Sequence, residues 1–352
     1  MKSRGRKKEL HFPNGALGRG KPERVVPSLL RLSYDFLASL QFGLFLVVII
    51  GLSAAVGSAF QEDFYRSSWF ATLLSALFLN LLLCTLKRGS TYLRTRCFGL
   101  KQIGVFVLHA GLLFVLAGGF ITVAKGERAR VPLAEGGEVS LGRFLRAGQD
   151  LKLRLEDFAI SYHPDGTPAQ FTARLALEDR STTIRGVAAV NHPFYYRGMK
   201  FYQYSYRWRV RIEVRSASGV RQVEVEEGDI LPVEEAGLHL KVYRYLPNFS
   251  PEWGMESKGV RPDNPRLLFS VYRGEERLGV GIAAPGEDVA LDGGVSVVFT
   301  GVRPVAVLLV KTDPGQPLVL TGGLVFAGGV LMILSSTFYR RTRIQHDEEE
   351  GS

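Results

Sequence analysis

Residues 103–124 read IGVFVLHAGLLFVLAGGFITVA. This block contains no Asp, Glu, Lys or Arg, and its length matches the ~20 residues that a helix needs to cross a ~30 Å hydrocarbon core. Three further blocks share both properties: 36–59, 69–86 and 318–338. Core helices of globular proteins are rarely so long and uncharged, and a helix satisfies its own backbone hydrogen bonds, as a lipid-spanning segment must. The sequence therefore predicts a bundle of four transmembrane helices.

The basic residues predict how these helices are oriented. Residues 1–35 carry nine Lys or Arg against three acidic residues, and residues 87–102, which connect the second and third blocks, carry only basic charges. Basic segments remain on the cytoplasmic side of a membrane. We therefore expect a multi-pass plasma (inner) membrane protein whose head (1–35) and tail (339–352) are cytoplasmic. Residues 125–317 would form one large domain on the periplasmic, extracytoplasmic side.

The net charge of +10 has the same explanation. Residues 1–124 carry 15 basic and 5 acidic residues, whereas residues 125–317 carry 26 and 25. A strongly basic protein can bind nucleic acid, but here the excess lies beside the predicted cytoplasmic membrane face. Contact with anionic membrane lipids explains it better, and we expect no nucleic-acid partner. The head, rich in Lys, Arg, Gly and Pro, is expected to be disordered.

The predicted outer domain is rich in strands. In residues 151–158, leucines alternate with charged residues, which is typical of a half-buried strand. Similar runs, separated by turn sequences such as Pro164-Asp165-Gly166, occupy residues 170–178, 200–215, 220–226, 238–245, 267–272, 278–283, 295–300 and 305–311. About ten short strands in succession indicate an all-β fold, either an antiparallel sandwich or an open barrel.

The two cysteines exclude several functions. Cys84 lies near the end of the second block and Cys97 in the connection that follows, so the outer domain contains none. The chain has no Cys-x-x-Cys and no Cys-x-x-Cys-His sequence. It is therefore neither a thioredoxin-type reductant nor a c-type cytochrome. Phosphate-binding loops and the signatures of hydrolases and zinc proteases are also absent from the sequence.

One histidine differs from the others. His163, His192 and His239 lie in turn-like or alternating sequence of the outer domain, where surface positions are expected. His109 lies six residues into the third block, ~9 Å deep at 1.5 Å per residue, in the predicted inner leaflet. Ionisable residues inside a span usually mark a pathway, a partner or a cofactor.

The same block predicts where His109 faces. Gly104, Gly111 and Gly118 recur every seven residues, which forms a seam that another helix can approach closely. At ~100° per residue, His109 points ~140–160° away from this seam. Two interpretations remain open from the residues alone: His109 binds a ligand in a cavity or beside a partner, or it is hydrogen-bonded to a neighbouring helix.

The order of these features resembles the ResB (CcsB) family of System II cytochrome c biogenesis. The likeness runs from about residue 32 to 341 and depends on the layout of three spans, an outer β domain and a fourth span. The fragments that carry it are Ser39-Leu40, Gly57-Ser58, Tyr65–Phe70, Leu79–Leu81 with Cys84, Leu108–Gly111, Asn191–Pro193 with Gly198 and Phe201–Tyr206, Pro262–Pro265, and Asp313–Gly315 with Gly322 and Gly329. The long basic head and a compact outer domain depart from the family.

The resemblance implies a function. A ResB-like subunit pairs with a CcsA-like haem-handling membrane subunit, carries haem across the membrane and helps to join it to reduced apocytochrome c. It implies that haem is bound in transit as b-type haem shared with the partner, and a thioredoxin-like thiol reductant is a further expected partner. His109 matches the family's haem ligand in the third span, so it is the candidate axial ligand of haem iron. No catalytic residue is assigned, because the chain would contribute to a lyase-type complex without a complete active site of its own.

Two alternatives come from other classes of protein. The chain could be a membrane scaffold without a cofactor, or a transport-complex subunit with a large external domain. Transport subunits of that kind usually place the domain after their first span, whereas here it follows the third. Trp69, Trp208 and Trp253 are far apart in the sequence, so this chain is not expected to supply the tryptophan-rich haem platform that the family assigns to the partner.

Overall fold

The computed structural model describes residues 29–60, 64–95 and 99–349. The chain forms two units: a helical unit that ends at Leu113 and resumes at Leu324, and a β-rich unit from Phe114 to Gly323. The long helices α4 (Leu100–Lys125) and α5 (Gln316–Glu349) belong partly to each. The head is predicted from the sequence to be disordered over residues 1–35, but residues 29–35 of it belong to a helix. Residues 1–28 and Cys97 lie outside the described residues.

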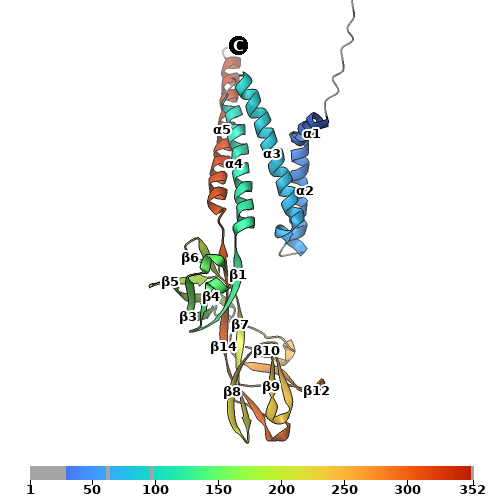
Figure 1. Cartoon of the computed structure of the whole chain (residues 1–352), viewed down its shortest axis with the longest axis vertical. Coiled ribbons are helices and arrows are strands. Elements are labelled where there is room, and N and C mark those ends of the chain that lie inside the picture. The colour runs from blue at the N-terminus through green and yellow to red at the C-terminus, as the bar shows by residue number, and fades with distance from the viewer. Residues whose placement is uncertain (1–28, 61–63, 96–98, 350–352) are drawn as a thin grey trace, which may run out of the picture. The chain divides into compact units, whose positions relative to one another are not determined.

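Within the described residues, four helices are long and apolar enough to cross a membrane. The segments that qualify are Leu40–Ala59 in α2 (Leu40–Phe60), Ser68–Arg94 in α3 (Ser68–Thr95), Leu100–Lys125 in α4 and Gln316–Phe338 in α5. The four-helix prediction is thereby confirmed, and the chain is an integral membrane protein. A short helix, α1 (Leu29–Leu37), precedes them (Figure 1).

The first span begins at Leu40, four residues later than the sequence suggested. The chain leaves the helical path at Ala38 and Ser39, and the Ser39 hydroxyl accepts a hydrogen bond from the Phe42 amide at 3.1 Å. A serine in this position caps the first turn of a helix. The apolar run continues through the break, so hydropathy alone could not reveal it.

Side chains of α3 stabilise this break. The Asn80 amide donates to the carbonyl oxygens of Leu37 at 2.6 Å and Ser39 at 3.1 Å. The Cys84 thiol donates to the Ala38 carbonyl at 3.2 Å. The Leu37 and Ala38 carbonyls accept from no helical amide of the described residues, whereas the Ser39 carbonyl also accepts from the Gly43 amide at 3.2 Å. Buried backbone groups need a hydrogen bond. Asn80, only 3% exposed, thus ties α3 to the α1–α2 junction.

Helices α4 and α5 approach each other at the glycine seam that the sequence predicted. A Cβ atom added to Gly104 would lie 3.1 Å from the Gly329 carbonyl oxygen, and one added to Gly118 would lie 2.8 Å from the Gly315 carbonyl oxygen. Small residues allow helix backbones to pack this closely in membranes. The role of the seam is confirmed, and its partner is the fourth span of the same chain.

The β-rich unit contains three antiparallel sheets. The largest has the order β1-β14-β7-β6, with β8 also paired to β7 and β13 to β14; the other two have the orders β12-β11-β10-β9 and β2-β3-β4-β5. The strands of the first sheet are β1 (Arg128–Ala134), β6 (Phe194–Tyr196), β7 (Met199–Ser216), β8 (Gly219–Glu226), β13 (Asp288–Ala290) and β14 (Ser296–Thr312). The second contains β9 (Ile230–Val233), β10 (Leu238–Leu246), β11 (Arg266–Arg273) and β12 (Glu276–Ala283). The third contains β2 (Glu138–Ser140), β3 (Leu151–Tyr162), β4 (Pro168–Asp179) and β5 (Thr182–Ala189).

The long strands β7 and β14 connect two hydrophobic cores. One core packs Phe201 and Leu308 of these strands against β3, β4 and β5. The other packs Ile212 and Phe299 against β9, β10, β11 and β12. A bulge between Phe299 and Gly301 lies between the two parts of β14. The all-β antiparallel prediction is confirmed, and the sheets form two sandwich-like halves that share two strands.

Candidate functional site

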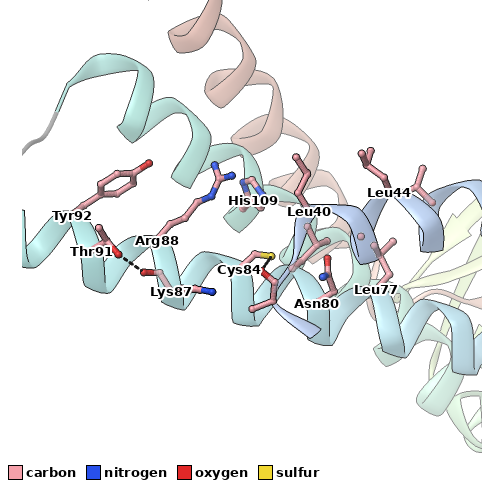
Figure 2. A pocket seen from close by; sticks show the side chains of 14 residues that line it. Leu40, Leu44, Leu77, Asn80, Cys84, Lys87, Arg88, Thr91, Tyr92 and His109 are labelled. Carbon is pink, nitrogen blue, oxygen red and sulfur yellow. Dashed lines mark hydrogen bonds between the residues drawn. The ribbon is translucent and has the colours of Figure 1, made fainter. Parts of the chain in front are cut away.

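A cavity of the helical unit contains His109. It has a volume of about 520 Å³, which lies within the range of small-molecule and cofactor pockets. Residues of α2, α3 and α4 line it together with Ala38 of the α1–α2 break (Figure 2). The lining residues are Ala38, Leu40, Gly43, Leu44, Val47, Leu77, Asn80, Leu81, Cys84, Lys87, Arg88, Thr91, Tyr92 and His109. The cavity therefore connects the predicted site residue with two segments that the sequence did not assign to a site.

The hydrogen bond of His109 determines which ring nitrogen is available. Nδ1 lies 2.7 Å from the Val105 carbonyl oxygen, one helical turn earlier. A carbonyl oxygen only accepts, so this contact requires the proton on Nδ1. The lone pair of the neutral ring is then on Nε2, which has no partner among the described residues. A neutral imidazole held through Nδ1–H by a backbone carbonyl is the usual state of a histidine ligand to a metal.

The walls of the cavity differ in polarity. Leu40, Leu44 and Val47 of α2 and Leu77 and Leu81 of α3 form an apolar part. Along α3, Asn80, Cys84 and Arg88 follow at intervals of four residues, so they share one face of the helix. Residues 87–92 add Lys87, Thr91 and Tyr92. The cavity thus has an apolar wall, an imidazole side chain on α4 and a cationic part near the C-terminal end of α3.

One of the two cations already has a partner. The Lys87 ammonium donates to the Asp35 carboxylate of α1 at 2.8 Å. This hydrogen bond, together with the positive charge, holds the pKa of Asp35 below its usual value. Both side chains are about half exposed, so the pair is expected to contribute little to stability. It does, however, direct Lys87 toward α1.

The structure shows the cavity's other half, which the sequence reasoning missed. An ionisable side chain inside an apolar block marks His109 in the sequence, whereas Asn80 and Cys84 belong to a motif of the second block and Arg88 to a basic connection. Their spacing of four residues on a helix was the available signal. The described residues include no cluster of three His, Cys, Asp or Glu side chains that could hold a metal ion.

The other histidines do not join His109. His163 is exposed and its carbonyl accepts from the Gly166 amide at 2.9 Å, so it belongs to a tight turn, as predicted. His192 is exposed and bridges to Ala189, and His239 is exposed on β10. Trp208 packs edge-on against Tyr206 and Tyr245, while Trp253 is exposed in a loop. These positions agree with surface or structural roles.

A comparison with known families identifies the architecture. The sequence matches the ResB-like family over residues 99–285, which is more than half of the chain. The chain belongs to the ResB-like family. This match begins one residue before α4, includes His109 and extends to the residues just after β12.

Individual relatives agree with this assignment. The chain is 28% identical over 265 residues to the cytochrome c biogenesis protein CcsB of Synechococcus sp. (strain RCC307), covering 71% of this chain and 56% of that protein. It is 27% identical over 267 residues to the protein of the same name from Microcystis aeruginosa (strain NIES-843 / IAM M-2473), with coverages of 70% and 55%. This ResB-like chain spans about half the length of the curated relatives it matches.

Among solved structures, the cytochrome c haem lyase CcmF aligns with 84% of this chain and 35% of that protein. The TM-score is 0.30 and the identity 12%, a similarity too low to indicate a shared fold.

Proposed function

We propose that this chain is a ResB-like subunit of a System II cytochrome c synthase. In this proposal it helps a CcsA-like membrane partner to carry haem across the membrane and attach it to apocytochrome c. The observation that carries the proposal is the membrane cavity with His109, whose Nε2 is unpartnered among the described residues. Membership of the ResB-like family and the names of the CcsB relatives support the pathway.

The residues of the cavity suit haem as a substrate in transit. Imidazole nitrogen is a common axial ligand of haem iron, and the Val105 carbonyl would hold the ring in the tautomer that presents Nε2. The leucines of α2 and α3 would contact the apolar macrocycle and exclude water. When bound, haem supplies the iron that His109 coordinates and the vinyl groups that later form thioether bonds.

His109 would hold the haem iron through Nε2, and a second ligand is expected from the partner. The other five histidines of the sequence, at positions 11, 163, 192, 239 and 346, lie outside the four segments that could span a membrane. A haem bound in this cavity with two imidazoles would therefore lie at the boundary with another subunit. In this proposal, the partner subunit completes the lining of the cavity.

The outer domain is proposed to receive apocytochrome c or to brace the partner. The β-rich unit contains no cysteine, so both thiols of the thioether bonds would come from the Cys-x-x-Cys-His sequence of the substrate. Those thiols must be reduced before attachment, which is the role assigned to a thioredoxin-like reductant. Positive charges around the spans are proposed to keep the head and tail cytoplasmic and the β-rich unit outside.

Haem co-purification tests the proposal. The wild-type chain, purified from its native membranes with its associated subunits, should show a Soret band, and His109→Ala should lower the haem content at least several-fold. His239→Ala, which removes an exposed histidine of β10, is the matched control and should retain wild-type haem. A colourless wild-type complex without a CcsA-like subunit would instead favour the cofactor-free scaffold.

A further inference from the structure

The cationic part of the cavity contains two basic side chains, and only one of them forms an ion pair among the described residues. Lys87 is paired with Asp35, but Arg88 has no acidic partner among the described residues. Figure 2 shows its guanidinium reaching from α3 toward His109 of α4. An arginine beside apolar walls forms its strongest interaction with an anion that accepts hydrogen bonds from the planar guanidinium group.

The cavity therefore selects a ligand with three properties. The ligand needs an apolar body for the wall formed by Leu40, Leu44 and Leu77, a Lewis-acidic atom for Nε2 of His109, and an anionic group for Arg88. A metalloporphyrin with carboxylate side chains on one edge meets all three. A neutral lipid lacks the metal, and a free phosphate lacks the apolar body.

We propose that Arg88 binds a propionate carboxylate of the haem that His109 coordinates and thereby sets the orientation of the porphyrin in the cavity. The inference rests on the proposed function. The propionate edge would then face the C-terminal end of α3, and the opposite edge would face the apolar wall at Leu40 and Leu44. Arg88 is thus a positioning residue: it would determine which edge of the porphyrin faces the cationic part of the cavity.

Lys87 does not replace Arg88 in this role. Its ammonium is bound to Asp35 at 2.8 Å and lies over the Tyr34 ring at 5.9 Å. Both contacts direct it toward α1 and away from a ligand held by His109. The two adjacent cations therefore act separately, one stabilising the α1 contact and the other binding the ligand.

The test compares haemin with haemin dimethyl ester, whose carboxylates are neutralised. The full chain, purified with its associated subunits and freed of endogenous haem, is placed in lipid nanodiscs and titrated with each compound by following the Soret band. We expect the wild type to bind haemin more tightly than the ester. Arg88→Gln should weaken haemin binding roughly tenfold to a hundredfold, as expected for loss of a charged hydrogen bond, and leave ester binding unchanged.

Two further variants make the result specific. Arg88→Lys retains the charge and should recover part of the preference for haemin, whereas Arg94→Gln, an exposed residue of the same helix outside the cavity, should behave as the wild type. Unchanged binding of the ester by Arg88→Gln shows that the variant folds. If Arg88→Gln still prefers haemin as strongly as the wild type, the inference is overturned.

Failure of the proposed function gives a different pattern. His109→Ala should lose affinity for haemin and for the ester alike, because both contain the iron. If His109→Ala binds both as the wild type does, or if the wild-type complex binds neither, the haem site itself is wrong and the role of Arg88 is rejected with it. If His109→Ala loses both while Arg88→Gln keeps the preference, only the role of Arg88 is rejected.

Discussion

The hydrogen bond between His109 and Val105 links a single residue to the proposed chemistry. It is formed between residues four apart in one helix, and it leaves Nε2 as the basic nitrogen. The sequence sufficed to select His109, because an ionisable side chain inside an apolar block is rare. It did not reveal Asn80, Cys84 and Arg88 as neighbours, because their contact with α4 depends on how the helices pack.

Glu227 provides a test of electrostatics in the outer domain. It lies after β8, and its carboxylate accepts from the Tyr245 amide at 2.7 Å. Burial raises the pKa of Glu227 above its usual value despite this hydrogen bond. A raised folded-state pKa means that the folded protein retains the proton more tightly, so this group's contribution to stability is full below about pH 4.5 and is lost as the pH rises through the folded pKa.

Glu227→Gln is therefore expected to stabilise the β-rich unit at pH 7 to 8. The glutamine keeps an oxygen that accepts from Tyr245 and removes a half-buried charge. The gain should shrink as the pH falls and disappear well below 4.5, where Glu227 is protonated in both the folded and the unfolded state. Thermal unfolding of the full chain at several pH values measures this, with the exposed Glu256→Gln as control; a gain that is independent of pH would contradict the explanation.

At the scale of elements, the α1–α2 break depends on a contact that no local signal predicts. Asn80 donates to Leu37 and Ser39 across more than 40 residues of sequence. Asn80→Leu leaves both carbonyls without these donors, so the break should open. Hydrogen exchange should rise in residues 37–43, whereas Ser75→Ala, which removes only a bond to its own helix at Ala71, should leave it unchanged. Equal exchange in both variants would show that Asn80 does not hold the junction.

The α4–α5 seam can be tested with two adjacent glycines. A Cβ atom at Gly118 would lie 2.7 Å from Val319 Cγ2, whereas a Cβ atom at Gly119 would meet no atom within 4 Å. We expect Gly118→Ala to lower the free energy of unfolding in lipid or detergent by about 1–3 kcal/mol through overpacking. Gly119→Ala should be neutral or should stabilise by up to about 1 kcal/mol, because alanine favours the helix. Similar effects from both would contradict the close helix contact.

Strand prediction succeeded where the alternation was long. The run 200–215 became β7, and 151–158 became part of β3. The two runs 295–300 and 305–311 form one strand, β14, which continues through Pro304. Pro304 is tolerated there because it is paired on one side only: it lies opposite Trp208 of β7, and β1 pairs with β14 only from Val305 onward. Prolines also concealed β1 and β9, which contain Pro132 and Pro232 and lie at sheet edges, where proline is tolerated.

At the scale of the whole molecule, the distribution of apolar and charged residues predicted the four spans and the β-rich domain. It did not predict which strands share each hydrophobic core. An alternating strand shows which side chains are buried together, yet not which sheet they face. Strands β7 and β14 bury Phe201 and Leu308 in one core and Ile212 and Phe299 in the other. The β-rich unit is joined to the spans by Glu127 and Thr312, where the Thr312 amide donates to the Glu127 carbonyl at 2.9 Å.

The proposed sidedness is open to a direct test. With the native cysteines replaced, Ser218→Cys in the turn between β7 and β8 should react with a membrane-impermeant thiol reagent in intact cells, because the β-rich unit is proposed to be outside. Ser3→Cys should react only after lysis, because the basic head is proposed to be cytoplasmic. The reverse labelling pattern would contradict the orientation and the inner-leaflet position of His109.

The central claim is that His109 coordinates haem inside the membrane, and ligand replacement tests it most directly. In His109→Gly the side chain is removed and the space becomes available to free imidazole. We expect the purified complex to lose its haem, and imidazole added during haem loading to restore a Soret spectrum typical of imidazole-ligated haem. Haem coordination by His109 would be contradicted by a wild-type haem content in His109→Gly without imidazole. It would also be contradicted by a loss of haem that imidazole does not reverse, provided that the control His239→Gly keeps a normal haem content.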